Sequence, residues 1–374
     1  MRSILHFAQD SDTSGFFPQL ALHHARSRFQ MVFGTLQPMA PWLRAHMEGQ
    51  GVRCLDCACP GRAAYPLGLL RLIRYLRRER IDILHTHLFD PSVVGQLAGR
   101  IARTPALVLT RHYSDYHTRI HRPVHVALDR LSTTLSHRVI AVSQHTADHL
   151  VRVERAPAGK VRVIPNGIDF DRIRPSGPDA RPRVRVALGI GDAPVALIAG
   201  RFHPEKGYET LLPAFARVVA RLPRAILLIA GAGPLESGYR RMAEGLGLGA
   251  SVRFLGFRKD LPDLMVASDI VALPSRAEAF GLAVAEALYL GTPVVASRVG
   301  GLPEIVRDGI DGCLVPPGDE SALADAIVRL LGDPAERRRL AGAGRTRIAE
   351  RFSFSSMVRG YELVYDELEP GTRS

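Results

Sequence analysis

Short runs of hydrophobic residues alternate with stretches of helical periodicity along most of the chain. In the first half, the runs that predict strands are 3–7, 31–34, 81–85, 106–110, 138–142 and 161–164. In the second half, they are 195–199, 226–230, 252–255, 270–273 and 294–296. Strands that alternate with amphipathic helices are typical of βαβ units, so the pattern predicts parallel sheets covered by helices.

The alternation is interrupted once, between residues 171 and 185, where prolines, a glycine and arginines follow no period. We therefore predict an α/β protein with two Rossmann-like, doubly wound parallel-sheet domains, 1–172 and 185–352, that face each other across a cleft. The segment 353–374 contains a last amphipathic pattern and is predicted to cross back to the N-terminal domain as a helix. Open parallel sheets bind ligands beyond the carboxyl ends of their strands, so functional residues are expected in the loops there.

The composition is that of an ordinary globular protein, with 46% hydrophobic and 23% charged residues. The first residues lack the pattern of a secretory signal, and the longest apolar runs are far too short to span a bilayer. We therefore expect a cytoplasmic protein. Its four cysteines, Cys54, Cys57, Cys59 and Cys313, do not complete a set of zinc ligands at the usual spacing, which favours reduced cysteines.

The chain has a net charge of +12 and an isoelectric point near 10.1. Of its 49 basic residues only Lys160, Lys206 and Lys259 are lysines, so arginine is its usual surface cation. The pattern in 67–80 predicts a basic amphipathic helix. Such a helix either binds an anionic membrane surface or covers a sheet as an ordinary crossover helix, and we favour the second interpretation. Nucleic acid is disfavoured as a partner, because no basic patch interleaved with aromatic residues is present.

The segment Gly200–Gly207 directly follows a predicted strand and combines the features of a phosphate site. Arg201 offers a planar guanidinium fork for phosphate oxygens, and Lys206 adds a second positive charge five residues later. A helix that begins near Gly207 would add its N-terminal N–H groups. The segment therefore predicts a cradle for a diphosphate, with an exposed basic loop as the alternative.

Two more glycine turns follow later strands, at Gly231–Pro234 and Gly300–Glu304, although such a turn alone is a weak signal. Between them, the segment Pro274–Ala287 presents Glu278 in a loop and Glu286 two helical turns later. Ionised carboxylates only accept hydrogen bonds, so they suit the hydroxyl groups of a sugar or a ribose. Taken alone, Glu286 is equally typical of a helix surface.

In their order along the chain, these segments resemble glycosyltransferase family 4. The resemblance also rests on Pro165–Asp169 and Phe254–Gly256, and it covers the chain from about residue 138 to the end. It implies the GT-B fold, sugar transfer with retention of configuration, a nucleotide-sugar donor, and neither a metal nor another cofactor.

The resemblance further implies roles for particular residues. Arg201 and Lys206 would bind the donor diphosphate, while Glu278 would contact the sugar and Glu286 the ribose. The expected catalytic residues are His112, Arg201, Lys206 and Glu278. The expected donor-binding residues are Gly15, Gly200, Arg201, Lys206, Gly231, Gly233, Phe257, Phe280, Gly281, Leu282 and Glu286.

In the N-terminal half, Leu109–His112 resembles the strand of the family that ends in a histidine of the cleft, which places His112 near the reacting sugar and the acceptor. His85 and His87 are expected just after another strand, on the acceptor side. A metal site formed by these three histidines is the disfavoured alternative. The turn at Gly15 departs from the family pattern, because it has one glycine and no acidic residue. This departure concerns recognition of the acceptor more than binding of the donor.

The expected reaction transfers a sugar from a nucleoside diphosphate, UDP before GDP, to an acceptor hydroxyl. Fixed cations and a helix N-terminus would stabilise the charge that develops on the leaving diphosphate. No carboxylate is assured as a nucleophile, so a same-face transfer fits better than double displacement. A lipid-linked or lipopolysaccharide glycan at the inner membrane surface suits the basic N-terminal half. The alternatives are a nucleotide-sugar epimerase or hydrolase, and a non-catalytic protein that docks on membranes.

Overall fold

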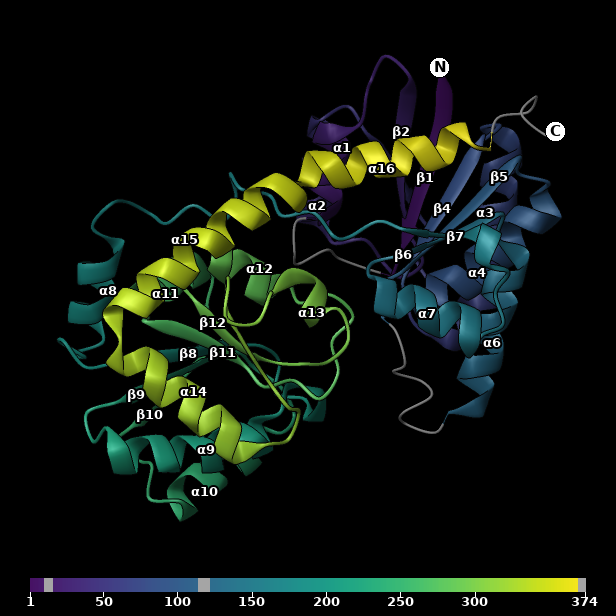
Figure 1. Ribbon diagram of the computed structural model, residues 1–374. Helices are drawn as coiled ribbons and strands as arrows, with labels where there is room; N and C mark the ends of the chain where they lie inside the picture. Colours follow the sequence, from purple (N-terminus) through teal and green to yellow (C-terminus); the bar gives the residue numbers. More distant parts are fainter. Residues whose placement is uncertain (10–15, 114–121, 369–374) are drawn as a thin grey trace. The chain divides into compact units, whose positions relative to one another are not determined.

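The computed structural model describes residues 1–9, 16–113 and 122–368 of the chain (Figure 1). The chain divides into two compact units, of which the first comprises Met1–Gly167 with Phe354–Ser374 and the second Ile168–Ser353. Each unit holds one parallel sheet flanked by helices. The predicted fold class, two Rossmann-like parallel-sheet domains, is thereby confirmed.

The N-terminal unit has a sheet of seven parallel strands in the order β3-β2-β1-β4-β5-β6-β7. The strands are β1 (Arg2–Ala8), β2 (Phe29–Thr35), β3 (Arg53–Asp56), β4 (Ile83–His87), β5 (Ala106–Arg111), β6 (Arg138–Ala141) and β7 (Val161–Val163). The described helices are α1 (Phe16–His23), α2 (Pro41–Gly49), α3 (Tyr65–Arg78), α4 (Phe89–Ala102), α6 (Pro123–Leu135), α7 (Gln144–Arg152) and α16 (Phe354–Asp366). Chain order reverses between β1 and β4, which makes this pair the switch point of the sheet.

Alternation along the central strands divides the core of the N-terminal unit between the two faces of the sheet. In β1, Leu5 and Phe7 pack with α3 and α4, whereas Ile4 and Ala8 pack with α1, α2 and α16. The last helix, α16, lies beside α1 (Figure 1). Its residues Tyr361 and Tyr365 are fully buried, so this helix is part of the core.

The C-terminal unit has six parallel strands in the order β10-β9-β8-β11-β12-β13. The strands are β8 (Val195–Ala199), β9 (Ile226–Ala230), β10 (Val252–Gly256), β11 (Ile270–Leu273), β12 (Val294–Ser297) and β13 (Cys313–Val315). The helices are α8 (Ala180–Ala187), α9 (Tyr208–Arg221), α10 (Glu236–Gly245), α11 (Leu261–Ala267), α12 (Leu282–Tyr289), α13 (Leu302–Ile305), α14 (Glu320–Gly332) and α15 (Pro334–Arg351). Within the described ranges, short 3₁₀ helices span Arg62–Ala64, Ala158–Lys160 and Pro204–Lys206. The switch point of this sheet lies between β8 and β11.

Two strands and one boundary differ from the expectations. The strands β3 and β13 were not predicted, because each is a short edge strand without a long apolar run. Residues 171–185, expected to be a linker, lie within the C-terminal unit and include the start of α8. Arginine side chains fix this segment: Arg181 donates to the Val266 carbonyl at 2.9 Å, and Arg185 donates to the Ala267 carbonyl at 2.8 Å. The irregular pattern therefore marks a segment held by hydrogen bonds, and the unit boundary falls at Gly167.

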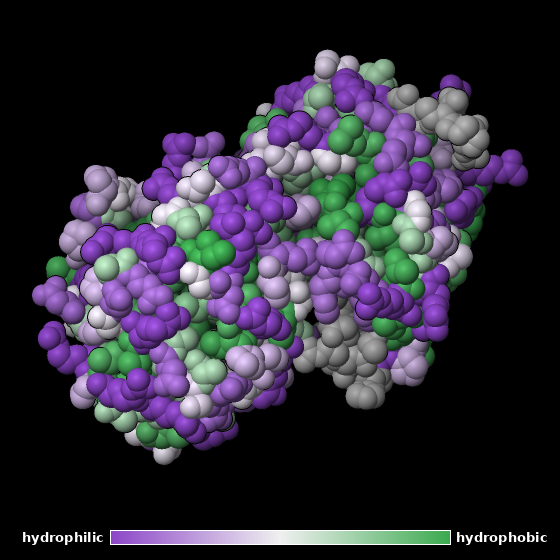
Figure 2. All heavy atoms as spheres, in the orientation of Figure 1, coloured by the Kyte–Doolittle hydropathy of each residue, from purple (hydrophilic) through white to green (hydrophobic). Residues whose placement is uncertain are grey.

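The basic helix α3 is a crossover helix of the N-terminal sheet. Leu72, Ile73 and Leu76 are buried against the sheet and α4. Leu67 and Leu70 are exposed. The arginines of α3 are exposed. Hydrophilic residues also cover much of the face of the molecule drawn in Figure 2. Among the described residues, no helix has both the length and the apolar character needed to cross a bilayer.

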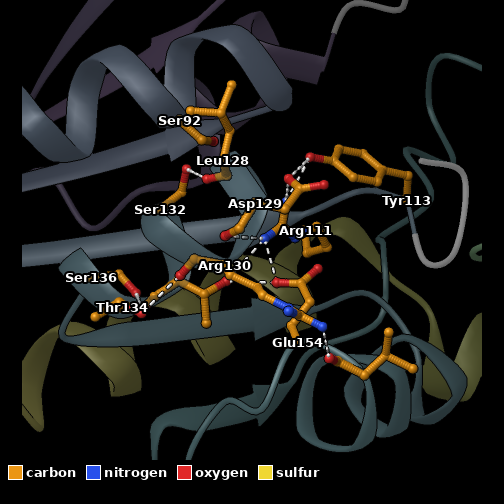
Figure 3. A network of polar contacts seen from close by, with 12 residues as sticks. Ser92, Arg111, Tyr113, Leu128, Asp129, Arg130, Ser132, Thr134, Ser136 and Glu154 are labelled. Atoms are coloured by element: carbon orange, nitrogen blue, oxygen red, sulfur yellow. Dashed lines mark hydrogen bonds and ion pairs between the residues drawn. The ribbon is translucent and has the colours of Figure 1, made fainter. Parts of the chain in front are cut away.

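A buried ion network fixes the carboxyl end of β5 (Figure 3). The Arg111 guanidinium is 1% exposed and donates hydrogen bonds to the carboxylates of Asp129 and Glu154, the latter at 2.9 Å. Arg111 also donates to the hydroxyls of Tyr113 at 2.6 Å and Thr133 at 3.0 Å. Burial raises the pKa of Glu154 although the Arg111 charge opposes this effect. The network therefore depends on one arginine to compensate two buried carboxyl groups.

We expect Arg111→Met to lower the free energy of unfolding of the N-terminal unit by about 3–5 kcal/mol, because removal of one partner leaves buried charge without compensation. Trp42, the one tryptophan of the chain, lies in this unit and reports its unfolding by fluorescence in urea. The control is Arg77→Met, since Arg77 is an exposed arginine of α3 and its loss should change stability by less than about 1 kcal/mol. Equal effects of the two substitutions would contradict the prediction.

Candidate functional site

The predicted donor-binding segments of the C-terminal unit follow strands of its sheet. Gly200 follows β8 and Pro274 follows β11, so the two segments lie on either side of the switch point. Gly231 and Gly233 follow β9, the other neighbour of β8. Parallel strands all end at the same edge of a sheet, which is why segments far apart in the sequence come together here.

Lys206 and Glu278 form an ion pair at this edge. Lys206 Nζ donates to Glu278 Oε2 at 2.6 Å, and both side chains are mostly buried. The hydroxyl of Ser275 lies 3.5 Å from the same carboxylate oxygen. Arg201 is exposed, and among the described residues no group accepts a hydrogen bond from its guanidinium. The site thus presents one paired cation, one paired carboxylate and one uncommitted cation within a few loops.

Two glycines allow these loops to approach each other. Gly207 has φ +73°, and a Cβ atom there would lie 1.9 Å from the carbonyl oxygen of Pro274. Gly300 has φ +55°, and a Cβ atom there would lie 1.7 Å from the carbonyl oxygen of Glu278. Both positions combine a left-handed backbone with direct backbone contact, so only glycine fits. They hold the segments of Lys206 and Glu278 in place.

The remaining predicted donor residues differ in exposure. Phe257 is 72% exposed beyond β10, Leu282 is 43% exposed at the first position of α12, and Phe280 is buried. Gly281 is the N-cap residue of α12 with φ +111°, and no side chain caps this helix start. The N–H groups of the first turn are therefore not satisfied by a capping side chain, and the helix dipole adds partial positive charge at this point.

Glu286 lies in α12, half-buried and two turns beyond Glu278. Burial raises its pKa to about 7, while the nearby Arg172 acts in the opposite direction. Among the described residues, no side chain makes a hydrogen bond or ion pair with the Glu286 carboxylate. Its half-buried carboxyl group therefore has no hydrogen-bond donor within the described part of the protein, although burial favours pairing of polar groups. The geometry suits a group that accepts hydrogen bonds from a bound molecule.

In the N-terminal unit, His85 and His87 lie elsewhere than expected, whereas His112 lies at the end of its strand as the sequence indicated. His85 and His87 are residues of β4, with no exposed surface, and do not follow it. The polar rings do not end the strand because their nitrogens are bonded inside the protein. His85 Nδ1 lies 2.7 Å from the Tyr365 hydroxyl and His85 Nε2 lies 2.6 Å from Thr110 Oγ1. His112, one residue beyond β5, is half-buried and is the one of the three with exposed surface.

His87 and His112 belong to a continuous chain of hydrogen bonds that the sequence did not predict. His112 Nε2 lies 3.1 Å from His87 Nδ1, and His87 Nε2 lies 3.0 Å from His6 Nδ1. His6 Nε2 lies 3.1 Å from His24 Nε2, and His24 Nδ1 lies 3.2 Å from Glu362 Oε1. Burial lowers the pKa of His112 to about 4 and lowers the pKa of His6 and His87 well below the usual value.

Side chains alternate between the two faces of a strand, and this alternation explains how the rings meet. Residues 4, 6 and 8 of β1 share the sheet face of residues 83, 85 and 87 of β4, and this face lies under α1 and α16. His6 is paired in register with His85, which the alternation in β1 and β4 could have indicated. Ring nitrogens of His6, His85 and His87 lie within 4.8 Å of one another, a spacing that also occurs in metal sites. Each of these nitrogens already has a hydrogen-bond partner in the protein, and the expectation of no metal stays a prediction. Gly15 lies outside the described residues.

Two parallel α/β units are the architecture of the GT-B glycosyltransferases, and comparisons with known proteins assign the chain to this class. The chain resembles Anabaena HepE in its complex with UDP and glucose at a TM-score of 0.83 and 25% identity, over 98% of this chain and 100% of that one. Sucrose-phosphate synthase of Thermosynechococcus elongatus, at 24% identity and a TM-score of 0.80, shares the fold over 98% of this chain and 99% of that one.

Comparisons of the amino-acid sequence show the family to which the chain belongs. The model for glycosyl transferases group 1 matches residues 181–347, and the model for glycosyltransferase family 4 matches residues 19–172. A D-inositol 3-phosphate glycosyltransferase of Saccharomonospora viridis is 35% identical over 325 residues, which cover 81% of this chain and 74% of that protein. The chain belongs to glycosyltransferase family 4, as the resemblance indicated.

The raised pKa of Glu286 predicts a specific pH dependence of stability. The ordinary value is 4.5 and the folded value about 7, so the contribution of the protonated carboxyl is complete below pH 4.5 and is lost as the pH rises through 7. Glu286→Gln removes this loss, so its melting temperature should rise relative to the wild type by a few degrees between pH 5 and pH 8. Differential scanning calorimetry measures the difference. Glu244→Gln, which changes an exposed carboxylate of α10 in the same unit, is the control and should follow the wild type at every pH.

Proposed function

We propose that the protein is a retaining, metal-independent glycosyltransferase that uses a UDP-sugar and transfers the sugar to an acceptor hydroxyl. The observation that carries this proposal is the Lys206–Glu278 pair, at 2.6 Å, together with the uncommitted guanidinium of Arg201 in the loop that follows β8 at the switch point of the sheet. A cation for a diphosphate and a carboxylate for sugar hydroxyls thus lie side by side. Similarity to HepE, which was solved with UDP and with UDP-glucose, supports UDP ahead of GDP as the nucleotide.

The charges assign distinct roles in the reaction. Arg201 and Lys206 bind the donor diphosphate and stabilise the negative charge that develops as the sugar leaves. Glu278 pairs with Lys206 and accepts hydrogen bonds from sugar hydroxyls, helped by the N–H groups of Phe280 and Gly281. Since Glu278 is held by Lys206, it is poorly suited to act as a nucleophile. Transfer on the same face, with the leaving phosphate taking the acceptor proton, follows from this assignment.

The nucleoside part of the donor is assigned to the outer elements of the site. Glu286 accepts hydrogen bonds from the ribose hydroxyls, and bound hydroxyl groups supply the donors that its half-buried carboxylate lacks in the protein. Gly231 and Gly233 let the backbone after β9 approach the phosphates, and Phe257 offers an exposed aromatic surface beyond β10. The donor site therefore occupies the carboxyl edge of one sheet.

The acceptor is assigned to the N-terminal unit, with His112 as the histidine nearest to the reaction. Two acceptor classes follow from different observations. The basic helix α3 suits a lipid-linked or lipopolysaccharide glycan at the inner face of the cell membrane. The names of the sequence relatives, D-inositol 3-phosphate glycosyltransferases, point to a small phosphorylated polyol, whose charge also matches a basic protein.

A thermal-shift panel tests the donor assignment. UDP or a UDP-sugar at about one hundred times its dissociation constant should stabilise the protein by about 2.7 kcal/mol, whereas ADP should give no shift. Lys206→Ala should weaken the shift and reduce the transfer rate by roughly a hundredfold, because it removes a charge that stabilises the leaving diphosphate. Lys259→Ala, which removes an exposed lysine, is the control and should retain both.

The outcomes separate the competing functions. Absence of a shift with every nucleotide at millimolar concentration would contradict the donor site and favour a docking protein. Release of nucleotide at the same rate with and without a lipid-linked glycan or D-inositol 3-phosphate would favour a hydrolase. Conversion of the UDP-sugar to its epimer would favour an epimerase.

Vesicle binding tests the proposed location on the membrane. Vesicles rich in anionic lipid should bind the protein at low salt and release it as salt rises, since each arginine near the surface contributes about 1 kcal/mol. Replacement of Arg71, Arg74, Arg77 and Arg78 by glutamate should abolish binding, as measured by sedimentation with the vesicles. Vesicles of neutral lipid are the control. Binding that resists salt, or that survives the four replacements, would contradict the electrostatic interpretation.

A further inference from the structure

The histidine chain of the N-terminal unit runs from a carboxylate to a half-exposed ring. Its inner end is Glu362 of α16, whose Oε1 also accepts the N–H of Ala25 at 2.9 Å. Arg28 Nη1 lies 3.9 Å from the other carboxylate oxygen. Burial favours the neutral form of Glu362, but the hydrogen bonds from His24 and Ala25 and the charge of Arg28 outweigh it and lower its pKa. The chain of rings therefore begins at an ionised acceptor.

The Glu362 carboxylate fixes which ring nitrogen of each linked histidine carries a proton. A carboxylate only accepts, so His24 must donate through Nδ1–H, and in its neutral form its Nε2 must then accept. His6 therefore donates to His24 through Nε2–H and accepts at Nδ1. By the same step His87 and then His112 each donate through Nε2–H. Each of the four hydrogen bonds is thus made by one of the four ring protons, and Nδ1 of His112 is left as an acceptor without a proton.

One added proton has a clear path through this arrangement. His112 gains the proton at Nδ1 and passes its Nε2 proton to Nδ1 of His87. His87 passes its own Nε2 proton to Nδ1 of His6, and His6 passes its Nε2 proton to Nε2 of His24. At the end every link again holds one proton, His24 carries both ring protons, and His112 now donates through Nδ1–H. Three bonds to hydrogen break inside the chain and three form, in addition to the one formed at His112.

We propose that His112, His87, His6 and His24 form a proton relay that takes up a proton at Nδ1 of His112 and places the positive charge on His24 beside Glu362. The inner rings are poor places for a charge, because they are fully buried and face other imidazoles. His24 alone contacts a carboxylate, so the charge is most stable there. Nδ1 of His112 has no hydrogen-bond partner among the described residues, which leaves it available to a bound molecule.

Other groups around the relay do not supply an alternative path. The rings of His85 and His87 are tilted by 30° with centroids 4.2 Å apart, but the nitrogens of His85 bond to Tyr365 and Thr110. Burial holds the pKa of Tyr361 and Tyr365 above the usual value and that of His85 below it. At the inner end, Arg28 pairs with Asp366 at 2.5 Å, and the exposed His23 bonds to the Gln19 carbonyl at 3.0 Å. The relay therefore has one charged terminus, formed by Glu362 and Arg28.

The relay changes what His112 offers to a substrate. In the uncharged state His112 accepts a hydrogen bond from a hydroxyl group, and in the charged state it donates one. This consequence rests on the proposed function, in which His112 lies near the acceptor. The uncharged state is the one that suits an acceptor hydroxyl, so transferase activity should fall as the pH drops through the point at which the relay takes up its proton.

The tautomers are measured directly by long-range ¹H–¹⁵N spectra of protein labelled with ¹⁵N-histidine and purified with a chelator. Above the pH at which the relay takes up its proton, His24 should carry its proton on Nδ1, and His6, His87 and His112 should carry theirs on Nε2. As the pH is lowered, His6, His87 and His112 should switch to Nδ1–H with one common midpoint while His24 becomes doubly protonated. Rings that become doubly protonated independently, or an Nδ1–H form of neutral His112 at high pH, would overturn the relay. Zinc-dependent signals from His6, His85 and His87 would overturn it in favour of a metal site.

Glu362→Gln provides the second test, with Asp366→Asn as the matched control on the same helix. Loss of the Glu362 charge should move the common midpoint to lower pH by at least about one unit. The acid limb of the pH profile of kcat/KM should move by the same amount. Asp366 bonds to Arg28 and to no histidine that the structure describes, so Asp366→Asn should leave the midpoint and the acid limb within a few tenths of a pH unit. A midpoint that is equal in the two variants would overturn the relay.

These measurements keep the two proposals apart. The tautomers of the wild type test the relay even if Glu362→Gln does not fold, and they do not require turnover. If the rings switch together but no sugar is transferred to any acceptor, the relay stands and the proposed function fails. If transfer occurs and the rings do not switch together, the proposed function stands and the relay fails.

Discussion

A parallel sheet that is covered on both faces confines polar chemistry to a small part of the molecule. Residues along the strands must be apolar or must find partners inside the protein, and ligands bind at the loops beyond the carboxyl edge. Both units obey this constraint, but they meet it differently. The C-terminal unit places its charges in loops beyond the strands, where Lys206 and Glu278 pair. The N-terminal unit keeps polar rings within the strands and satisfies them with one another.

This difference determines which parts the sequence could predict. Strands buried on both faces leave long apolar runs, and β8, β9 and β11 begin and end where those runs do. The edge strand β3 leaves no such run, because it is only half-covered and carries polar residues at both ends, whereas β13 is buried and apolar but only three residues long. Residues 171–185 looked like a linker because their contacts are hydrogen bonds from arginine side chains, which no hydrophobic period records.

The candidate site shows the same limit at the level of single residues. Arg201, Lys206, Glu278 and Glu286 could be found because short motifs after strands carry them, and motifs are local in sequence. The partner of Lys206 could not be derived from the motifs, since Lys206 and Glu278 are 72 positions apart in the sequence and only the fold brings them together. The histidine chain was missed for a similar reason. His85 and His87 were placed beyond their strand because polar residues usually end an apolar run, and His6, His24 and Glu362 lie in three other segments.

The position of α16 has a further consequence for the chemistry of the N-terminal unit. Its sequence follows the whole C-terminal unit, yet its Glu362 is the one carboxylate that bonds to the histidine chain among the described residues. Without that anion, the four linked imidazoles could order their protons in either direction with similar energy, and His112 would have no fixed role. A single ionised acceptor at one end removes this degeneracy, because each ring must then accept on one side and donate on the other. The helix therefore contributes more than buried apolar surface, because its carboxylate fixes the direction in which the hydrogen bonds between the histidines run.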